Sequence, residues 1–301
     1  MKHSFSVVLI IITVWLAAQS IGLLVVEHYG VSELPAGVER PDTDASGVLW
    51  YLIAGIGIGT VLILLLARFK QQRLWAVWFS LAVFILAYVA LAAFVPIVYA
   101  LIIAALFVYL KLDTRLNWIL RNIPELFLYA GIAGVFVPLL TIQVALIILI
   151  AISLYDVYAV WRSKHMIALA RFQMESGHFA GFSMPKGDDT SKKPSGRASA
   201  KKTATKAAKT STTRLAKKPA KRSGSHAGGS AILGGGDFAF PLLYAGTLLL
   251  SYGWIPALGA VIGGYFGLLT LFMISHENRF YPAMPFLAAG LILGSLVGVA
   301  I

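Results

Sequence analysis

Apolar segments long enough to cross a lipid bilayer follow one another along most of this chain. Of its 301 residues, 58% are hydrophobic and only 13% are charged, a balance typical of polytopic membrane proteins and foreign to soluble domains of this size. We therefore predict an all-α membrane protein that crosses the membrane nine times. The spans are expected at about 5–26, 47–67, 74–94, 96–111, 124–140, 142–162, 233–251, 254–275 and 282–301.

The basic residues of the expected loops indicate how these spans are oriented. Three lysines or arginines lie between residues 68 and 73 in the second loop, and three lie between residues 111 and 121 in the fourth. The first loop is mainly acidic. Loops rich in lysine and arginine stay on the cytoplasmic side. We predict a multi-pass protein of the cell membrane with its N-terminus in the cytoplasm and its C-terminus outside.

The expected sixth loop, at about 163–232, differs in kind from the other loops. From Arg162 to Ile232 the net charge is +13, and its core is a low-complexity tract of Lys, Ala, Ser and Thr. Such a tract cannot bury an apolar core and is expected to be disordered. It divides the chain into spans 1–6 (residues 1–162), the loop, and spans 7–9 (residues 233–301). A solvated cytoplasmic tail that reinforces the topology is the favoured interpretation. Attraction to anionic lipid is the functional alternative, and nucleic acid is not expected.

Two aspartates lie within apolar stretches, where a charged side chain costs at least a few kcal/mol. Asp156 precedes Arg162 by six residues, and Asp237 follows Leu233 by four. At 1.5 Å per residue these offsets correspond to depths of roughly 9 and 6 Å on consecutive, antiparallel helices. The sequence therefore predicts a facing pair of carboxyl groups. Such a pair can share one proton and activate a water molecule.

The residues around Asp237 favour access of water and of an extended peptide. Gly234, Gly235 and Gly236 precede it and allow another backbone to approach closely. Pro241 lacks the N–H that would bond the Asp237 carbonyl, which weakens the helix at that turn. An ordinary, closely packed helix start is the alternative interpretation of the same residues.

Three motifs in order resemble those of the presenilin and signal peptide peptidase family of intramembrane aspartyl proteases. They are Tyr155-Asp156 in the sixth span, Gly234-Gly235-Gly236-Asp237-Phe238 opening the seventh, and Pro282-Ala283-Met284-Pro285 opening the ninth. They correspond to the YD, GxGD and PAL motifs of the family. The resemblance covers the whole chain and is strongest to archaeal members of presenilin type. It implies a presenilin-like bundle of nine helices.

The resemblance also implies a role for each matching residue of the first two motifs. Asp156 and Asp237 would form the catalytic dyad, and Tyr155 would line the site beside Asp156. Gly234 and Gly236 would be the two glycines of the GxGD motif. The ionised carboxyl group would take a proton from water while the other donates to the substrate carbonyl. This chemistry needs no metal and no cofactor.

The third motif and two neighbouring positions complete the site that the resemblance implies. Pro282, Ala283 and Met284 would support the geometry of the site and bind substrate. Met284 stands where the family usually has leucine, a swap that nearly conserves volume. Gly235 replaces a larger apolar residue at a position that influences the choice of cleavage site. Phe238 is typical of presenilins.

The backbone around the third motif is also informative without the family. Tyr281 and Met284 each precede a proline and are biased toward an extended conformation. An extended segment beside the dyad could pair with an unwound substrate strand. The alternative is a plain helix start with proline in its first turn.

Several other features have structural interpretations. The glycines at 259, 263 and 267 and those at 290, 294 and 298 form two small-residue faces, expected to pack within the bundle, with a homo-oligomer contact as the alternative. Glu125, directly after Pro124, is expected at the cytoplasmic start of the fifth span and outside the site. The chain has no cysteine and no HExxH motif, which excludes thiol chemistry and disfavours a zinc protease.

The function predicted is hydrolysis of peptide bonds within the transmembrane segments of membrane proteins or signal peptides. The main alternative is a proton- or cation-coupled transporter, because intramembrane acidic pairs also mark ion pathways. No internal repeat of the kind common in transporters is evident, and the two aspartates fall on consecutive spans. A membrane anchor for the basic loop is a third hypothesis, but it leaves the aspartates and the proline motif unexplained.

Overall fold

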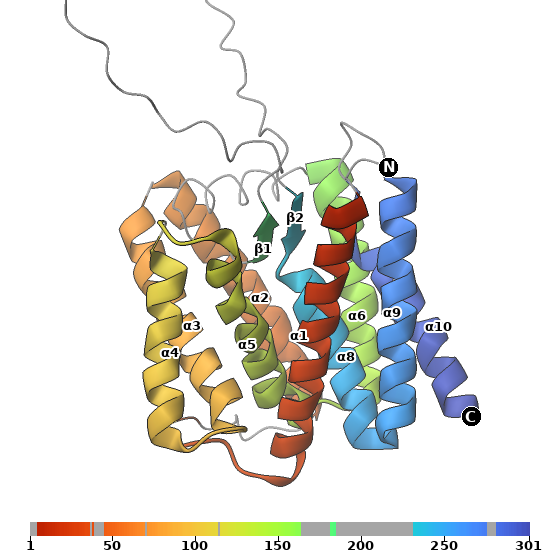
Figure 1. The fold of residues 1–301 in the computed structure, drawn as a ribbon. Coiled ribbons are helices and arrows are strands. Elements are labelled where there is room, and N and C mark those ends of the chain that lie inside the picture. Colours follow the sequence, from red (N-terminus) through yellow and green to blue (C-terminus); the bar gives the residue numbers. More distant parts are fainter. Residues whose placement is uncertain are drawn as a thin grey trace, which may run out of the picture.

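The computed structural model describes residues 5–36, 38, 45–69, 71–113, 115–163, 181–184, 231–275 and 281–301. These residues form nine α-helices and one small sheet (Figure 1). The α-helices are α1 (Phe5–Val31), α2 (Ala45–Arg68), α3 (Gln72–Ala92), α4 (Ile97–Leu112), α5 (Trp118–Phe136), α6 (Ile142–Tyr158), α8 (Gly236–Tyr252), α9 (Trp254–Ile274) and α10 (Met284–Ala300).

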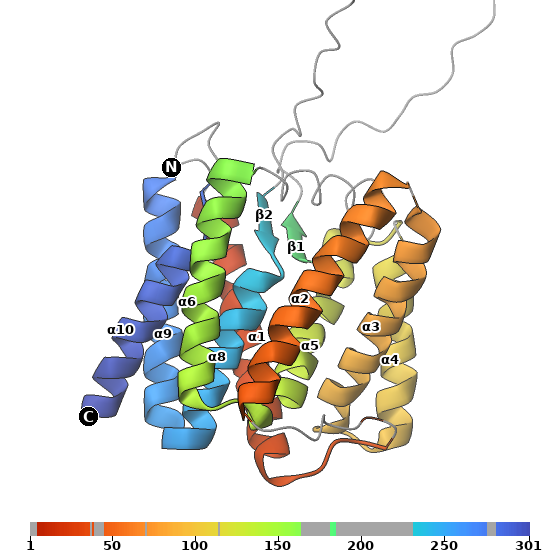
Figure 2. The ribbon, with the colours of Figure 1, turned by 180° about the vertical axis from the view of Figure 1, so that it is seen from behind.

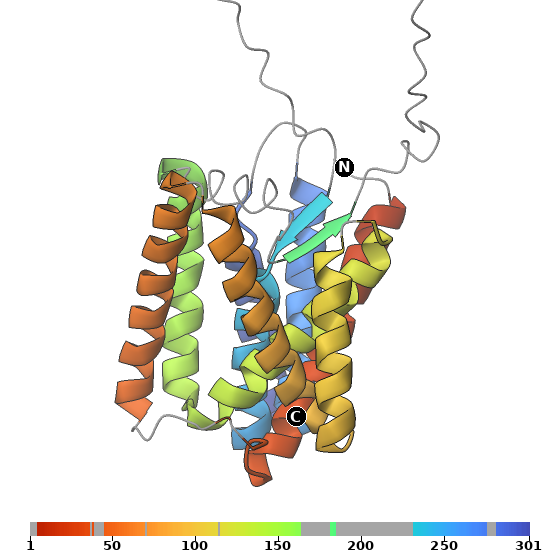
Figure 3. The same ribbon diagram turned by 90° about the vertical axis from the view of Figure 1, so that its left-hand side faces the viewer.

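Three short elements extend or join these helices. A 3-10 turn, η1 (Val137–Leu139), continues α5, and a π-helical turn, η2 (Ala159–Ser163), continues α6. Strands β1 (Gly181–Met184) and β2 (Ala231–Gly234) pair antiparallel. Figure 3 shows this sheet near one end of the bundle, above the first turn of α8. Strand β1 also packs against α5.

Helix α1 lies in the middle of the bundle, between α5 and α8 (Figure 1). It packs against α5, α8 and α9 and buries large side chains such as Ile11, Trp15 and Leu23. Helices α3 and α4 cover α5 on one side, whereas α10 covers α9 on the other. Seen from behind, α6 lies beside α8 and α10 (Figure 2). The last turn of α6 and the first turn of α8 are thereby brought together at the same end.

The turn between α8 and α9 depends on one glycine. Gly253 has φ +88°, a conformation that residues with a side chain rarely adopt. Its N–H donates to the carbonyl of Leu249 and closes α8, and α9 begins at the next residue. The reversal lets the two helices run side by side.

Each predicted span overlaps one of these helices, but two of the helix starts differ from the predicted boundaries in a way that affects the site. Helix α5 begins at Trp118 and not near residue 124, so Pro124 lies inside it. Helix α8 begins at Gly236 and not at 233, because residues 231–234 pair with β1 as a strand. Most of the predicted basic loop lies outside the described residues.

Five helical segments within the described part of the chain are long and apolar enough to cross a membrane. They are Val7–Val31, Gln72–Ala92, Trp118–Leu139, Ile142–Arg162 and Trp254–Ile274. Shorter apolar stretches cover Ile53–Leu66, Ile97–Leu112 and Met284–Ala300. The helical membrane protein predicted from composition is confirmed, whereas nine crossings stays a prediction.

Helices α9 and α10 pack with their two glycine faces against each other. A Cβ atom at Gly263 would overlap the carbonyl of Gly290, and one at Gly290 would overlap the carbonyl of Gly263. The predicted packing of these faces within the bundle is therefore confirmed. In a lipid bilayer the hydrophobic effect does not drive helices together, so the van der Waals contact between such close backbones stabilises the α9–α10 pair.

Replacing Gly263 with alanine is expected to lower the thermal unfolding temperature in detergent by several degrees. The added methyl group must push α9 away from α10, an overpacking that costs about 1–3 kcal/mol. Gly55→Ala in α2 is the matched control, because nothing lies within 4 Å of a Cβ at that position. Equal unfolding temperatures for the two variants would contradict this packing.

Candidate active site

The two aspartates of the predicted pair lie in neighbouring helices near one end of the bundle. Asp156 precedes the π-helical turn η2 at the end of α6, and Asp237 is in the first turn of α8. The two helices pack against each other. Asp156 is buried and Asp237 is half-buried. At this end of the bundle the charge of Asp156 reaches the carboxyl group of Asp237.

Each carboxylate accepts a backbone N–H, Asp156 from the proline motif and Asp237 from its own glycine motif. The N–H of Met284 donates to Oδ2 of Asp156 at 3.1 Å, and the N–H of Ala283 faces the same carboxylate. The N–H of Gly234 donates to Oδ2 of Asp237 at 3.2 Å. Main-chain donors have fixed positions, so these contacts hold both carboxylates without relying on flexible side chains.

The glycines before Asp237 connect the sheet to the helix. Gly234 is the last residue of β2, Gly235 is the N-cap of α8, and Gly236 is its first residue. A Cβ at Gly234 would lie 3.3 Å from Oδ2 of Asp237 and crowd the carboxylate. This glycine therefore leaves room for the charged group as well as for an approaching backbone.

The proline motif lies against Asp156, but its backbone differs from one expectation. Pro282, Ala283 and Met284 are buried. Met284 is the first residue of α10, with Pro285 in the first turn, so the expectation of an extended Met284 is wrong. Proline suits the first turn of a helix, where its missing N–H removes no intrahelical bond. The helix start instead directs the N–H of Met284 at Asp156.

Aromatic side chains flank both aspartates. Tyr155 is half-buried and lies within electrostatic range of Asp156, its neighbour in sequence. Phe238, which follows Asp237, is almost completely buried. Its ring stacks on Tyr129 of α5, with centroids 5.0 Å apart and an angle of 9° between the planes. The sequence-predicted residues of all three motifs are thus brought together, and α5 contributes a contact that sequence analysis missed.

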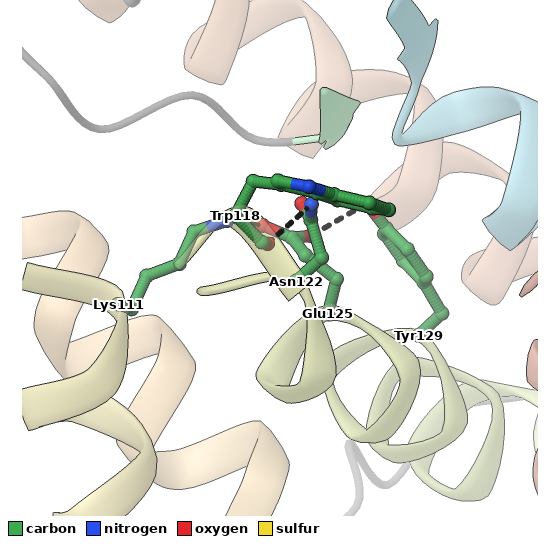
Figure 4. Close-up of polar contacts among 5 residues, drawn as sticks. All are labelled: Lys111, Trp118, Asn122, Glu125 and Tyr129. Atoms are coloured by element: carbon green, nitrogen blue, oxygen red, sulfur yellow. Dashed lines mark hydrogen bonds and ion pairs between the residues drawn. The ribbon is translucent and has the colours of Figure 1, made fainter. Parts of the chain in front are cut away.

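A buried pair of opposite charges, Lys111 and Glu125, lies next to Tyr129 (Figure 4). Lys111 at the end of α4 forms a short ion pair with Glu125 of α5, and both side chains are almost inaccessible. The hydroxyl of Tyr129 donates to the other oxygen of Glu125 at 2.6 Å. Glu125 therefore lies two turns inside α5, and its expected place at the start of the fifth span is wrong. Lys111 is likewise a buried partner and not a loop residue.

The first turn of α5 also touches the sheet that leads to Asp237. Trp118 meets the ring of Phe182 in β1 edge-to-face, with centroids 6.0 Å apart. Asn122 donates to the carbonyl of Trp118 at 2.8 Å and completes this turn (Figure 4). Helix α5 thus supports the site through both Phe238 and the β1–β2 sheet.

Helix α1 supplies two further contacts that sequence analysis missed. The indole N–H of Trp15 donates to the carbonyl of Asp237 at 2.9 Å. The amide of Gln19 donates to the carbonyl of Phe238 at 3.0 Å. A glutamine in an otherwise apolar span was the available signal, because a polar side chain in lipid needs a partner.

Comparisons with known proteins agree with this geometry. The profile of the family described as signal-peptide peptidase, presenilin aspartyl protease matches residues 9–301. A comparison with curated protein sequences finds no match.

Two similar solved structures are crystal forms described as a presenilin family intramembrane aspartate protease, in space groups C222 and P2. The first is 22% identical, with a TM-score of 0.63 over 97% of this chain and 98% of that one. The second is also 22% identical, with a TM-score of 0.61 over 96% of each chain. At this identity the likeness concerns the fold.

Proposed function

Because the chain belongs to the signal-peptide peptidase and presenilin family of aspartyl proteases, we propose that Asp156 and Asp237 are its catalytic pair. One observation carries this proposal. Asp156 and Asp237 lie in packed helices at the same end of the bundle, and a backbone N–H holds each carboxylate, that of Met284 on Asp156 and that of Gly234 on Asp237. Neither the family match nor the structure supports the transporter alternative.

The chemistry follows from two neighbouring carboxyl groups that share one proton. The ionised carboxyl accepts a proton from a water molecule as the water oxygen attacks the carbonyl carbon of the substrate. The protonated carboxyl donates its proton to the carbonyl oxygen. In the collapse of the resulting gem-diol, the carboxyl that took the proton from water donates it to the amide nitrogen, the other carboxylate takes a proton from a gem-diol hydroxyl, and the C–N bond breaks to give a carboxylic acid and an amine. The backbone donors at Met284 and Gly234 keep both carboxylates oriented during these steps.

The substrates proposed are transmembrane segments that unwind locally. A helix shields its peptide bonds within i to i−4 hydrogen bonds, so the cleaved bond must first leave the helix. Within the described residues the β1–β2 sheet has two strands, so each has an edge without a strand partner in that sheet. An extended substrate paired with such an edge would run toward Gly235 and Asp237, which directly follow β2.

A pair of glycines at the scissile bond of a reporter is expected to raise its cleavage rate by up to about 30-fold over a pair of alanines. Each glycine makes the helix about 1 kcal/mol less favourable, which lowers the cost of unwinding before the chemical step. The rates are compared with purified protein in detergent. The same glycine pair two helical turns away is the control. Equal rates for glycine and alanine at the scissile bond would contradict prior unwinding.

The proposed topology has nine crossings in the cell membrane, with the N-terminus cytoplasmic and the C-terminus outside. The first turn of α1 and the last turn of α10 lie at opposite ends of the bundle (Figure 1), which supports an odd number of crossings. We also propose the division into residues 1–162, 163–232 and 233–301, with the basic loop contacting anionic lipid. The glycine faces of α9 and α10 contact each other within the chain, so no homo-oligomer is proposed through them.

A further inference from the structure

The first turn of α8 contains a hydrogen-bonding defect beside a proposed catalytic residue. In a regular helix the carbonyl of Asp237 would accept the N–H of residue 241. That residue is Pro241, which has no N–H. A carbonyl without a partner at this depth would be costly, because no water in the lipid core can replace the donor.

Helix α1 supplies the missing donor. The indole N–H of Trp15 lies 2.9 Å from the carbonyl oxygen of Asp237. Trp15 is completely buried, so its ring has little freedom to move. The hydrogen bond that proline removes from within α8 is thereby replaced by one from a different helix.

A second donor on α1 lies one helical turn further along. Residues four apart project from the same face of a helix, so Gln19 also faces α8, and its Nε2 donates to the carbonyl of Phe238 at 3.0 Å. Gln19 is completely buried, and its Oε1 has no partner among the residues that the structure describes. One polar side chain is thus kept in the core with only its donor used.

We propose that Trp15 and Gln19 are positioning residues for the Asp237 carboxyl group, an inference that rests on the proposed catalytic pair. They fix two consecutive carbonyls of a turn that Pro241 has left without its own hydrogen bond. The turn can then stay open on the side of the substrate while the backbone that carries Asp237 keeps one position. Loss of either donor misplaces the carboxyl group without touching the substrate.

The experiment compares Trp15→Phe in two backgrounds, the natural sequence and Pro241→Ala. Phenylalanine keeps much of the buried aromatic surface and removes the N–H. In the natural background kcat for a transmembrane reporter peptide is expected to fall about tenfold, the size of one hydrogen bond, with KM unchanged. In the Pro241→Ala background residue 241 regains an N–H that can donate to the carbonyl of Asp237, so Trp15→Phe should change kcat less than twofold.

Two further variants separate positioning from general damage. Trp254→Phe removes an indole N–H that donates to Glu27 at 2.8 Å, near the α8–α9 turn, and should leave kcat within twofold. Gln19→Met removes the second donor at similar length and should lower kcat severalfold with KM unchanged. It also provides a test if Trp15→Phe does not fold, as judged by size-exclusion chromatography.

The outcomes distinguish this proposal from the proposed function. If the unaltered chain cleaves the reporter and both Asp156→Asn and Asp237→Asn abolish cleavage, the catalytic pair is supported whatever the effect of Trp15→Phe. Equal losses from Trp15→Phe in both backgrounds, or an effect confined to KM, would overturn the positioning role while leaving the pair intact. If Trp15→Phe lowers kcat in the natural background but not in the Pro241→Ala background, the positioning role is supported. A merely structural defect would lower kcat by the same factor in both backgrounds.

Discussion

Asp156→Asn and Asp237→Asn are each expected to lower kcat for a transmembrane reporter by at least about 1,000-fold. An amide keeps the shape of the side chain but can neither take a proton from water nor hold the proton that the pair shares. Two carboxyl groups that share one proton would act as one unit, so we expect the double variant to lose about as much as either single variant. The rates are measured with purified protein and a peptide that contains one transmembrane segment.

Asp113→Asn is the matched control for this prediction. Asp113 follows α4 at a half-buried position, where its carboxylate accepts the N–H of Arg115 at 2.9 Å. Its replacement should leave kcat within twofold. A single aspartate variant of the pair that keeps a tenth of the activity, or a double variant far below both singles, would contradict a shared catalytic unit.

Lys111→Met is expected to destabilise the folded protein strongly. It leaves the buried Glu125 carboxylate without its cation, and breaking such a pair costs about 3–5 kcal/mol. The thermal unfolding temperature in detergent should fall by roughly 10 °C. Adding Glu125→Gln removes the orphaned charge and keeps an acceptor for the hydroxyl of Tyr129. Much of the loss should then be recovered.

The control for Lys111→Met replaces an exposed cation that pairs with no buried carboxylate among the residues that the structure describes. Arg73 is exposed in the first turn of α3, and Arg73→Met should shift the unfolding temperature by no more than a degree or two. If Lys111→Met behaves like Arg73→Met, the pair carries no net stabilisation. If the double variant is less stable than Lys111→Met, the unpaired Glu125 charge is not the source of the loss.

The parts of the site that could be predicted depend on a strong local signal. An aspartate in an apolar run is costly and therefore informative, and helical rise alone placed Asp156 and Asp237 at similar depth. The structure places both residues at the same end of the bundle, in helices α6 and α8, which pack against each other. The small-residue faces of α9 and α10 were predictable for a similar reason, since regular glycine spacing has few other uses in a transmembrane helix.

Other parts depend on contacts between residues far apart in the chain. The start of the seventh span was misplaced because the pairing of residues 231–234 with residues 181–184 has no signal in either segment alone. Proline at 124 indicated a helix start, but tertiary packing carries α5 through it from Trp118. Lys111 was interpreted as a loop charge because its partner, Glu125, is known only from the fold.

The contacts of α1 with α8 could not be predicted for the same reason, because they join residues far apart in the chain. Pro241 predicted that the carbonyl of Asp237 loses its helical donor, but nothing in the sequence says which residue replaces it. Trp15 precedes Asp237 by 222 positions and lies in the middle of the first span, where nothing in the neighbouring sequence indicates a partner. Only the packing of α1 against α8 shows which carbonyl its indole N–H meets.

Cleavage of peptide bonds inside a membrane-spanning segment by Asp156 and Asp237 can be measured with the purified protein in liposomes that hold a single-span reporter, by determining the masses of the products. We expect products that end within the transmembrane segment and that are absent with the Asp156→Asn/Asp237→Asn variant. Products that end only in the exposed flanks, or cleavage that persists in the double variant, would contradict this mechanism.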